Sequence, residues 1–258
     1  MTHPSVAGEL LPGAGGPPIV LLHSLALDRT VWDRSVDRLR ELGDVFVCDL
    51  PGHGRSERIS EITIEDMADA VAHALRESLG GPALVWGMSL GGMVAQALAV
   101  RHPGRVLGLG LADTTAWYGP DAATAWQDRA AKAQRDGFAA LAGFQLARWF
   151  GPDFLAAEPA VATELLEVFQ RNDIGSYVAT CRAMGAMDLR ASVAAITVPT
   201  RIIVGADDYA TPVRHSEDLR SRIPGSSLRV LSGRSHLSAV EAPGELVAET
   251  EQLLKQIA

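Results

Sequence analysis

Cysteine is scarce in this sequence. Two cysteines, Cys48 and Cys181, occur in 258 residues, and they lie far apart without the close spacing of a metal-binding pair. A disulfide framework is therefore excluded, and no metal site is predicted. The simplest interpretation is a cytoplasmic protein with reduced thiols.

Long apolar runs and basic clusters are missing as well. No apolar stretch has the length needed to cross a membrane, and the first residues lack the basic and then apolar pattern of a secretory signal. The formal net charge is −8, and no basic run stands out. We therefore expect neither a membrane nor a nucleic acid as a partner, and the oligomeric state is not indicated.

The sequence is instead rich in short apolar runs that alternate with amphipathic segments. Hydrophobic residues make up 47% of the chain and charged residues 21%, as in an ordinary globular protein with a sizeable core. The apolar runs predict buried strands at residues 19–22, 45–48 and 83–86, and further strands are predicted at 106–112, 198–205 and 227–231. Helices are predicted between them, at 30–42, 63–79, 90–102, 212–222 and 243–257. This rhythm predicts an α/β fold, a mostly parallel sheet with helices on both faces, after an irregular Gly- and Pro-rich lead-in at 1–17.

The rhythm is interrupted between residues 115 and 188. This stretch has no strand pattern, contains many aromatic residues, and shows helical patterns near 121–135, 138–150, 159–171 and 177–187. We predict a helical cap at 115–188, inserted into a core domain that is formed by residues 1–114 and 189–258. Trp126 and Trp149 are its candidate substrate-binding residues. The alternative is an ordinary helical layer whose aromatics belong to the core.

A glycine-rich turn follows the predicted strand at 83–86. Residues 87–91 read Gly-Met-Ser-Leu-Gly, which matches the G-x-S-x-G pattern of a nucleophile elbow when a strand precedes it and a helix follows. Ser89 would adopt a strained backbone conformation, and side chains in place of the glycines would crowd the turn. The alternative is a glycine-rich turn with an incidental serine.

A serine nucleophile needs a base, and the base needs a carboxylate that orients it. In parallel sheets such groups lie in loops at the carboxyl ends of strands. His236 follows the last predicted strand and is the candidate base. Asp208 follows the strand before it and is the preferred acid, with Asp207 and Asp113 as alternatives that would otherwise stabilise a turn or loop.

The negative oxygen formed when Ser89 attacks a carbonyl needs two hydrogen-bond donors. The N–H of Leu90, directly after the serine, is one candidate. The N–H of Leu25, in the loop after the first buried strand, is the other, with His23 organising that loop. The sequence shows no metal-ligand set and no dinucleotide fingerprint, so no cofactor is expected.

With serine, aspartate and histidine in this order, most of the chain resembles the α/β-hydrolase superfamily. A finer resemblance is to the branch that contains the 3-oxoadipate enol-lactonases. It is carried by residues 21–28 with Trp32 and Asp33, Asp49 with 52–56, 87–93, 187–190, 198–200, 208–212, and 236–238 with Glu241.

The sequence departs from the family pattern in two places. Ser24 replaces the glycine that usually follows the histidine of the oxyanion loop, so the resemblance alone does not define the geometry of that loop. The segment before Ile19 is short and rich in Gly and Pro. We therefore expect the sheet to lack one or both of the usual opening strands.

The resemblance implies that Ser89 opens a small ester or lactone to an acyl-enzyme, and that His236 protonates the leaving oxygen and then activates water. Substrates of enol-lactonases carry a carboxylate. Arg129, Arg148 and Arg182 are therefore candidate cations near the pocket, although each could equally be a solvated surface residue. Alternatives are a general carboxylesterase, a C–C bond hydrolase, a cofactor-free haloperoxidase-type enzyme, or a low-turnover protein that binds a ligand in the capped pocket.

Overall fold

A seven-stranded sheet forms the centre of the computed structural model, which describes residues 3–257. The strand order is β1-β3-β2-β4-β5-β6-β7. Strands β2 to β7 are parallel to their neighbours, whereas β1 pairs antiparallel with β3. The strands are β1 (Gly8–Leu11), β2 (Ile19–Leu22), β3 (Val45–Cys48), β4 (Ala83–Met88), β5 (Val106–Ala112), β6 (Thr200–Gly205) and β7 (Ser227–Leu231). The predicted α/β-hydrolase fold is confirmed.

The N-terminal segment is more ordered than its composition predicts. Residues 8–11 form strand β1, with Gly8 opposite Cys48 and Leu11 opposite Val45. The expectation of a wholly irregular lead-in at 1–17 is therefore wrong. Among the described residues, one strand precedes Ile19, so one of the two usual opening strands is present. The strand was missed because it is short and mostly exposed, and has no alternating apolar pattern.

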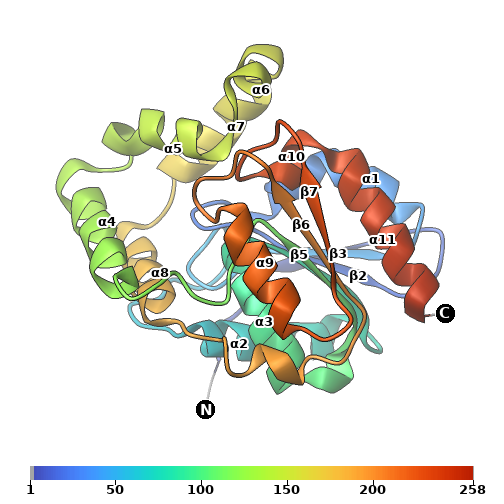
Figure 1. The fold of residues 1–258 in the computed structure, drawn as a ribbon. Coiled ribbons are helices and arrows are strands. Elements are labelled where there is room, and N and C mark those ends of the chain that lie inside the picture. The colour runs from blue at the N-terminus through green and yellow to red at the C-terminus, as the bar shows by residue number, and fades with distance from the viewer. Residues whose placement is uncertain (1–2, 258) are drawn as a thin grey trace.

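Helices cover both faces of the sheet (Figure 1). The helices α1 (Asp33–Arg40) and α11 (Pro243–Ile257) lie together on one face. The other face carries α2 (Ile64–Ser78), α3 (Leu90–Arg101) and α9 (Val213–Arg222). Short 3₁₀ turns η1 (Arg29–Trp32), η2 (Pro103–Arg105) and η4 (Val193–Ala195) complete the connections. None of the described helices is long and apolar enough to span a bilayer.

Residues 122–186 form a helical segment beyond the sheet (Figure 1). It contains α4 (Ala122–Asp136), η3 (Ala139–Leu141), α5 (Ala142–Trp149), α6 (Pro152–Ala157), α7 (Pro159–Gln170) and α8 (Ile174–Ala186). We call this the α4–α8 segment. The four predicted helices lie within a few residues of observed ones, and α6 and the short helix α10 (Ser238–Glu241) were not predicted. Within the described residues, this part of the chain is therefore a layer made of helices without strands.

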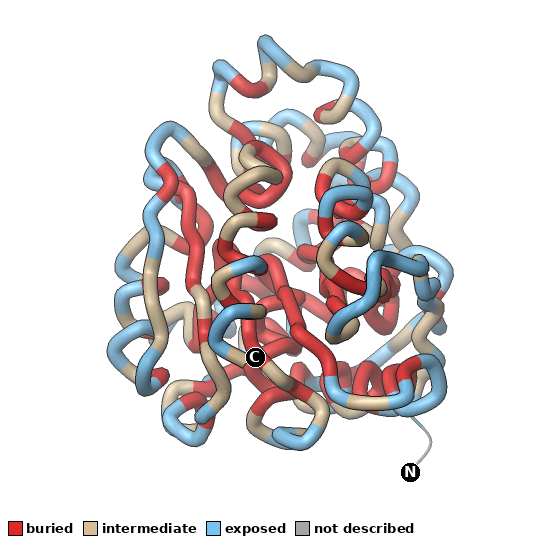
Figure 2. Tube along the Cα trace, turned by 90° about the vertical axis from the view of Figure 1, so that its right-hand side faces the viewer, coloured by how far each residue is buried: buried red, intermediate tan, exposed pale blue. Residues whose placement is uncertain are grey.

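The core is continuous through the sheet. Figure 2 shows buried residues along the central strands and exposed ones on the outer loops and helix faces. Every residue of β2, β3 and β4 is buried, because these strands have sheet neighbours at both edges and helices over both faces. This rigid frame fixes the strand ends from which the candidate site residues emerge.

Candidate active site

The turn between β4 and α3 holds Ser89 in a left-handed backbone conformation, with φ 53° and ψ −114°. A Cβ at Gly87 would collide with the Gly91 backbone, and one at Gly91 would collide with the carbonyl of Leu22. The glycines are therefore required because strand and helix backbones nearly touch. The predicted strand–serine–helix turn is present, and it brings the serine beside the end of β2.

Ser89, His236 and Asp208 form one hydrogen-bonded line. The Ser89 hydroxyl donates to Nε2 of His236 at 3.0 Å. Nδ1 of His236 in turn donates to Oδ2 of Asp208 at 2.9 Å. This arrangement fixes the histidine tautomer with its free lone pair toward the serine, as a general base requires. All three side chains are buried, although Ser89 is more than a hundred residues from the other two in the chain.

Asp208 is held as a carboxylate. Its Oδ1 accepts from the N–H groups of Ala210 and Thr211 at 2.7 and 3.0 Å, and its Oδ2 accepts from the Thr211 hydroxyl at 2.8 Å. Burial by itself would raise the pKa of Asp208, but the charge and hydrogen bond of His236 and the Thr211 donors outweigh it and lower the pKa to about 2. Asp208 is therefore ionised at neutral pH.

The two alternative acids do not reach His236. Asp207 is exposed, and its side chain makes no hydrogen bond or ion pair with His236. Asp113 is fully buried, accepts from the Gly205 N–H at 3.0 Å, and accepts from the N–H and hydroxyl of Ser238 at 2.9 and 2.7 Å. Burial, together with the Asp208 charge, raises the pKa of Asp113 well above its ordinary value. Asp113 thus links the end of β6 to the loop that carries His236.

The oxyanion loop, residues 23–27, lies beside Ser89 at the end of β2. Nδ1 of His23 donates to the Ser24 carbonyl at 2.8 Å, and Nε2 accepts from the Leu50 N–H at 2.8 Å. Both ring nitrogens are thereby used, and His23 organises the loop as the sequence predicts. The N–H groups of Leu25 and Leu90 have no hydrogen-bond acceptor among the described residues. Both are free to bind a developing oxyanion.

Ser24, which stands where the family usually has a glycine, takes part in a hydrogen-bonded turn of the oxyanion loop. The Leu27 N–H donates to the Ser24 carbonyl at 3.2 Å, and Ser24 is not in the left-handed region. Among the described residues other than glycine, left-handed φ values occur at Ala26, Ser89 and Asp113. Backbone strain in this protein is therefore concentrated around the site.

A narrow cavity lies between the line of Ser89 and His236 and the α4–α8 segment. Trp126 and Trp149, the predicted substrate-binding residues, line it together with Ser89, Leu25 and His236. The space has room for about one water molecule. A substrate must therefore displace side chains of the segment or enter from an adjoining cavity.

Two arginines in this cavity were candidates in the sequence but could not be distinguished there from surface residues. Arg129 donates to the Tyr177 hydroxyl at 2.7 Å and to Oε1 of Gln145 at 2.8 Å. Arg148 makes no hydrogen bond to the described residues, and its guanidinium lies over the Tyr209 ring, 5.5 Å from the centroid. Neither forms an ion pair with a carboxylate in the described part of the chain. Arg182, the third candidate, is exposed and lines a different cavity.

Further lining residues had no signal in the sequence. Tyr118, Gln145 and Met184 also face the narrow cavity, and Tyr118 packs edge-on against Trp126. A larger cavity of about 430 Å³ adjoins it and shares Tyr118, Trp126, Gln145 and the two arginines. The second cavity, which also contains apolar residues of α4 and α5, provides the adjoining volume for a substrate.

Comparisons with known proteins agree with this architecture. The sequence model described as "Alpha/beta hydrolase family" matches residues 19–250. The chain is 30% identical over 245 residues to 3-oxoadipate enol-lactonase 2 of Acinetobacter baylyi, covering 94% of this chain and 90% of that protein. It is 31% identical over 228 residues to the pimeloyl-[acyl-carrier protein] methyl ester esterase of Chromobacterium violaceum, covering 86% and 87% of the two chains.

A solved structure shows the same likeness in three dimensions. The crystal structure of the enol-lactonase from Burkholderia xenovorans LB400 superposes with a TM-score of 0.91 and 31% sequence identity, over 97% of this chain and 96% of that one. The similarity therefore extends across the sheet and the α4–α8 segment alike.

Proposed function

Because the chain belongs to the alpha/beta hydrolase family, we propose that it is a serine hydrolase that opens a small lactone or ester through an acyl-enzyme on Ser89. The observation that carries this proposal is the unbroken line from Ser89 through His236 to Asp208, with both hydrogen bonds at 3.0 Å or less. A serine hydroxyl is a weak nucleophile at neutral pH, and this arrangement supplies the base that it needs.

The first half of the reaction acylates the enzyme. His236 takes the Ser89 proton at Nε2 while Oγ attacks the carbonyl carbon, and the resulting oxyanion binds the N–H groups of Leu90 and Leu25. The tetrahedral intermediate then collapses, the bond to the ester oxygen breaks, and His236 returns the proton to that oxygen. In a lactone the leaving oxygen stays attached to the acyl chain.

The second half releases the product. Water enters beside the acyl-enzyme, His236 takes a proton from this water, and the resulting hydroxide oxygen attacks the acyl carbon. Collapse of this second intermediate breaks the bond to Oγ, and the proton returns to Ser89. Asp208 remains ionised throughout and stabilises the imidazolium.

We further propose that the substrate carries a carboxylate near the bond that is cleaved, as 3-oxoadipate enol-lactone does. Arg129 and Arg148 line the narrow cavity with Ser89, and neither has a carboxylate partner among the described residues. Burial lowers the pKa of Arg148, and the nearby Arg129 charge adds to this effect. An anionic substrate would offset the repulsion between the two cations and replace the lost hydration.

The α4–α8 segment would then serve as the cap of the enzyme, over residues 115–188, with 1–114 and 189–258 as the core. This assignment is supported by the position of Trp126, Trp149 and both arginines, which all come from α4 and α5 and face Ser89. The cap would set substrate choice, and the core would supply the reacting groups.

Turnover of the enol-lactone of 3-oxoadipate by the wild-type protein and by Ser89→Ala tests the proposal. We expect rapid loss of lactone with the wild type and a reduction in kcat on the order of 10⁴-fold or more in the variant, because the nucleophile is gone. Small carboxylate-bearing esters and their neutral methyl esters, assayed in parallel, test the anionic preference.

Two results would count against the proposal in different ways. Turnover that persists in a folded Ser89→Ala protein would overturn the nucleophile. Hydrolysis of neutral esters in preference to anionic substrates, with Ser89 still required, would overturn the carboxylate preference and leave the serine hydrolase in place.

A further inference from the structure

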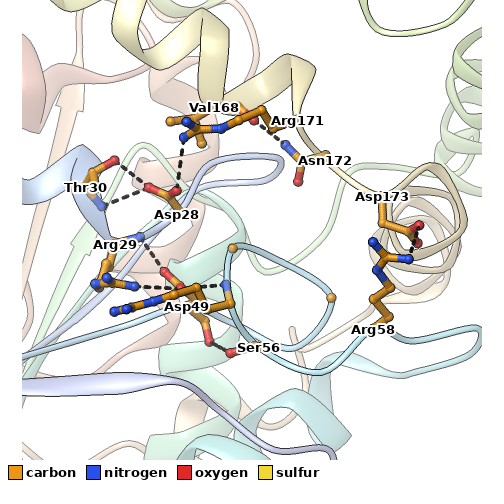
Figure 3. Close-up of a pocket in the computed structure, with 13 residues that line it drawn as sticks. Asp28, Arg29, Thr30, Asp49, Ser56, Arg58, Val168, Arg171, Asn172 and Asp173 are labelled. Carbon is orange, nitrogen blue, oxygen red and sulfur yellow. Dashed lines mark hydrogen bonds and ion pairs between the residues drawn. The ribbon is translucent and has the colours of Figure 1, made fainter.

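A third cavity, of about 360 Å³, lies between the core and the end of α7 (Figure 3). None of Ser89, His236 and Asp208 lines it. Its floor is the buried Asp49, which accepts from the backbone N–H and the guanidinium of Arg29 at 2.9 Å each, and from the Arg55 N–H at 2.9 Å. The negative charge of Asp49 is therefore satisfied within the chain and needs no ligand. Because core residues and residues at the end of α7 line the cavity together, we interpret this region as a junction between the core and the α4–α8 segment.

Asn172 spans this junction. It lies just after α7, and its amide nitrogen contacts the carbonyls of Val168 and Phe169, in the last turn of that helix, at 3.0 Å each. The same nitrogen donates to the carbonyl of Ala26 at 2.8 Å, across 146 residues of sequence. Figure 3 shows Asn172 between the end of α7 and the loops of the core. One amide thus connects the segment directly to the core.

Ala26 belongs to the oxyanion loop. It is fully buried and has φ 58°, a left-handed conformation that is strained for a residue with a Cβ. Within the loop, the Leu27 N–H closes a turn on the Ser24 carbonyl at 3.2 Å. The contact from Asn172 therefore acts on the strained residue directly after Leu25, whose N–H is a proposed oxyanion donor.

We propose that Asn172 is a positioning residue, which holds the oxyanion loop through the Ala26 carbonyl so that the Leu25 N–H stays directed at the reacting carbonyl. This inference rests on the proposed function, since it concerns the oxyanion of that reaction. Asn172 itself touches neither the substrate nor Ser89.

A second contact shows that the segment is bonded to both catalytic loops. The carbonyl of Trp149, at the end of α5, accepts from the N–H of Leu237 at 3.1 Å, one residue after His236. The helices that would bind the substrate are therefore hydrogen-bonded to the loop of the general base and to the oxyanion loop. Substrate contacts in the segment are thereby coupled to the geometry of catalysis.

The test compares Asn172→Ala and Asn172→Asp with a matched control, Arg171→Ala. Arg171 is the neighbouring residue of the same junction, and its exposed guanidinium pairs with Asp28 at 3.9 Å. We expect Asn172→Ala to lower kcat about tenfold with KM nearly unchanged, because loss of a whole oxyanion donor costs 10²–10³-fold and misplacement costs less. Asn172→Asp, which cannot donate and repels the Ala26 carbonyl, should lower kcat at least as much. Arg171→Ala should match the wild type.

Binding of a boronic acid separates positioning from simple stabilisation. A boronate forms a tetrahedral adduct with the serine that needs the oxyanion donors, whereas the product carboxylate does not. We expect boronate affinity to fall in parallel with kcat in both Asn172 variants while product affinity holds. A lowered Tm with unchanged kcat and boronate affinity would overturn the proposal, and so would an equal loss in Arg171→Ala.

These outcomes are distinct from those that test the proposed function. If Ser89→Ala keeps its turnover, the serine mechanism fails whatever Asn172 does. If Ser89 is required and both Asn172 variants behave as the wild type does, the positioning role alone fails. Should Asn172→Ala not fold, Asn172→Asp gives the same reading, because it preserves the size of the side chain.

Discussion

The two sides of the catalytic cavity differ in how their charges are satisfied. On the sheet side, Asp208 and Asp113 are buried, and each accepts several hydrogen bonds from the chain itself. On the side of the α4–α8 segment, Arg129 and Arg148 have no carboxylate partner among the described residues. The carboxyl groups on the sheet side therefore have their hydrogen-bond partners without a ligand. The two arginines on the segment side carry positive charge that an anionic ligand could neutralise.

This difference shows how the proposed work is divided. Groups that must act in every turnover are fixed by strand ends and backbone donors, which are rigid and move little. Groups that would recognise one substrate lie on helices that pack against the sheet through side chains and a few hydrogen bonds. The contrast can be tested by variants on each side of the cavity. Changes at the sheet should affect kcat, and changes to the cavity-lining arginines of the segment should affect substrate choice.

The largest effect is expected on the sheet side, from Asp208→Asn. An asparagine amide favours the wrong tautomer of His236, and the corresponding change in other serine triads lowers kcat about 10⁴-fold. Steady-state kinetics with the best substrate measures it. Asp207→Asn, one residue away and exposed, is the matched control and should keep wild-type kcat. Equal losses in both variants would remove the distinction between the two carboxylates.

A smaller effect is expected on the segment side, from Arg148→Ala. Arg148 makes no hydrogen bond to the described residues, so its removal leaves no other polar group without a partner. The free energy of unfolding should therefore change little. A charged hydrogen bond is worth roughly 1.5–3 kcal/mol, and kcat/KM for a carboxylate-bearing ester should fall about tenfold to a hundredfold. The neutral methyl ester of the same acid should be unaffected.

Arg182→Ala is the control for that experiment, since Arg182 lies in the same segment but lines another cavity. It should leave both esters unchanged. A loss of activity toward the neutral ester in Arg148→Ala would mean that Arg148 supports catalysis in general, and the contrast between the two sides would weaken.

The smallest effect concerns a carboxyl group that supports the His236 loop. Oε1 of Glu241 accepts from the Ser235 N–H at 2.8 Å, and Oε2 has no partner among the described residues. Burial raises the pKa of Glu241 from 4.5 to about 7, against the lowering effects of the Ser235 hydrogen bond and Arg234, with Asp207 adding to the rise. The folded state therefore binds this proton more tightly than the unfolded state does.

The sign of the pH effect follows from that difference. Stability from Glu241 is fully present below about pH 4.5 and is lost as the pH rises through about 7. Glu241→Gln has no titrating group at this position, so this loss of stability should disappear. Between pH 4.5 and 7 the Tm of the variant should therefore fall less than that of the wild type. The difference should be roughly 2–4 °C for each kcal/mol of unfolding free energy that the wild type loses. Thermal melts across this pH range measure the difference, and parallel curves for the two proteins would contradict the shifted pKa.

The sequence was most informative where chemistry depends on local backbone. Strands β2, β3 and β5 were predicted to the residue because continuous apolar runs bounded by turns have few alternative structures, and the bounds of β7 were predicted as well. The turn at Ser89 was predictable because its glycines are adjacent in the chain. Asp208 and His236 followed from the rule that catalytic loops lie after parallel strands.

The rest depended on packing between distant segments. Strand β1 is short and exposed, so only its pairing with β3 defines it. The placement of Arg148 in the cavity and of Arg182 outside it depends on how α4, α5 and α8 turn against the sheet, which a single sequence does not encode locally. The bond from Asn172 to Ala26 joins residues 146 positions apart and has no motif.

The most direct test of the account is the intact mass of the protein during turnover of a slow ester or lactone, quenched in acid and followed by peptide mapping. We predict a mass increase equal to the acyl group, located on the peptide that contains Ser89 and absent from Ser89→Ala. An acyl group on another residue, or turnover by Ser89→Ala at the wild-type rate, would contradict the assignment of Ser89 as the nucleophile.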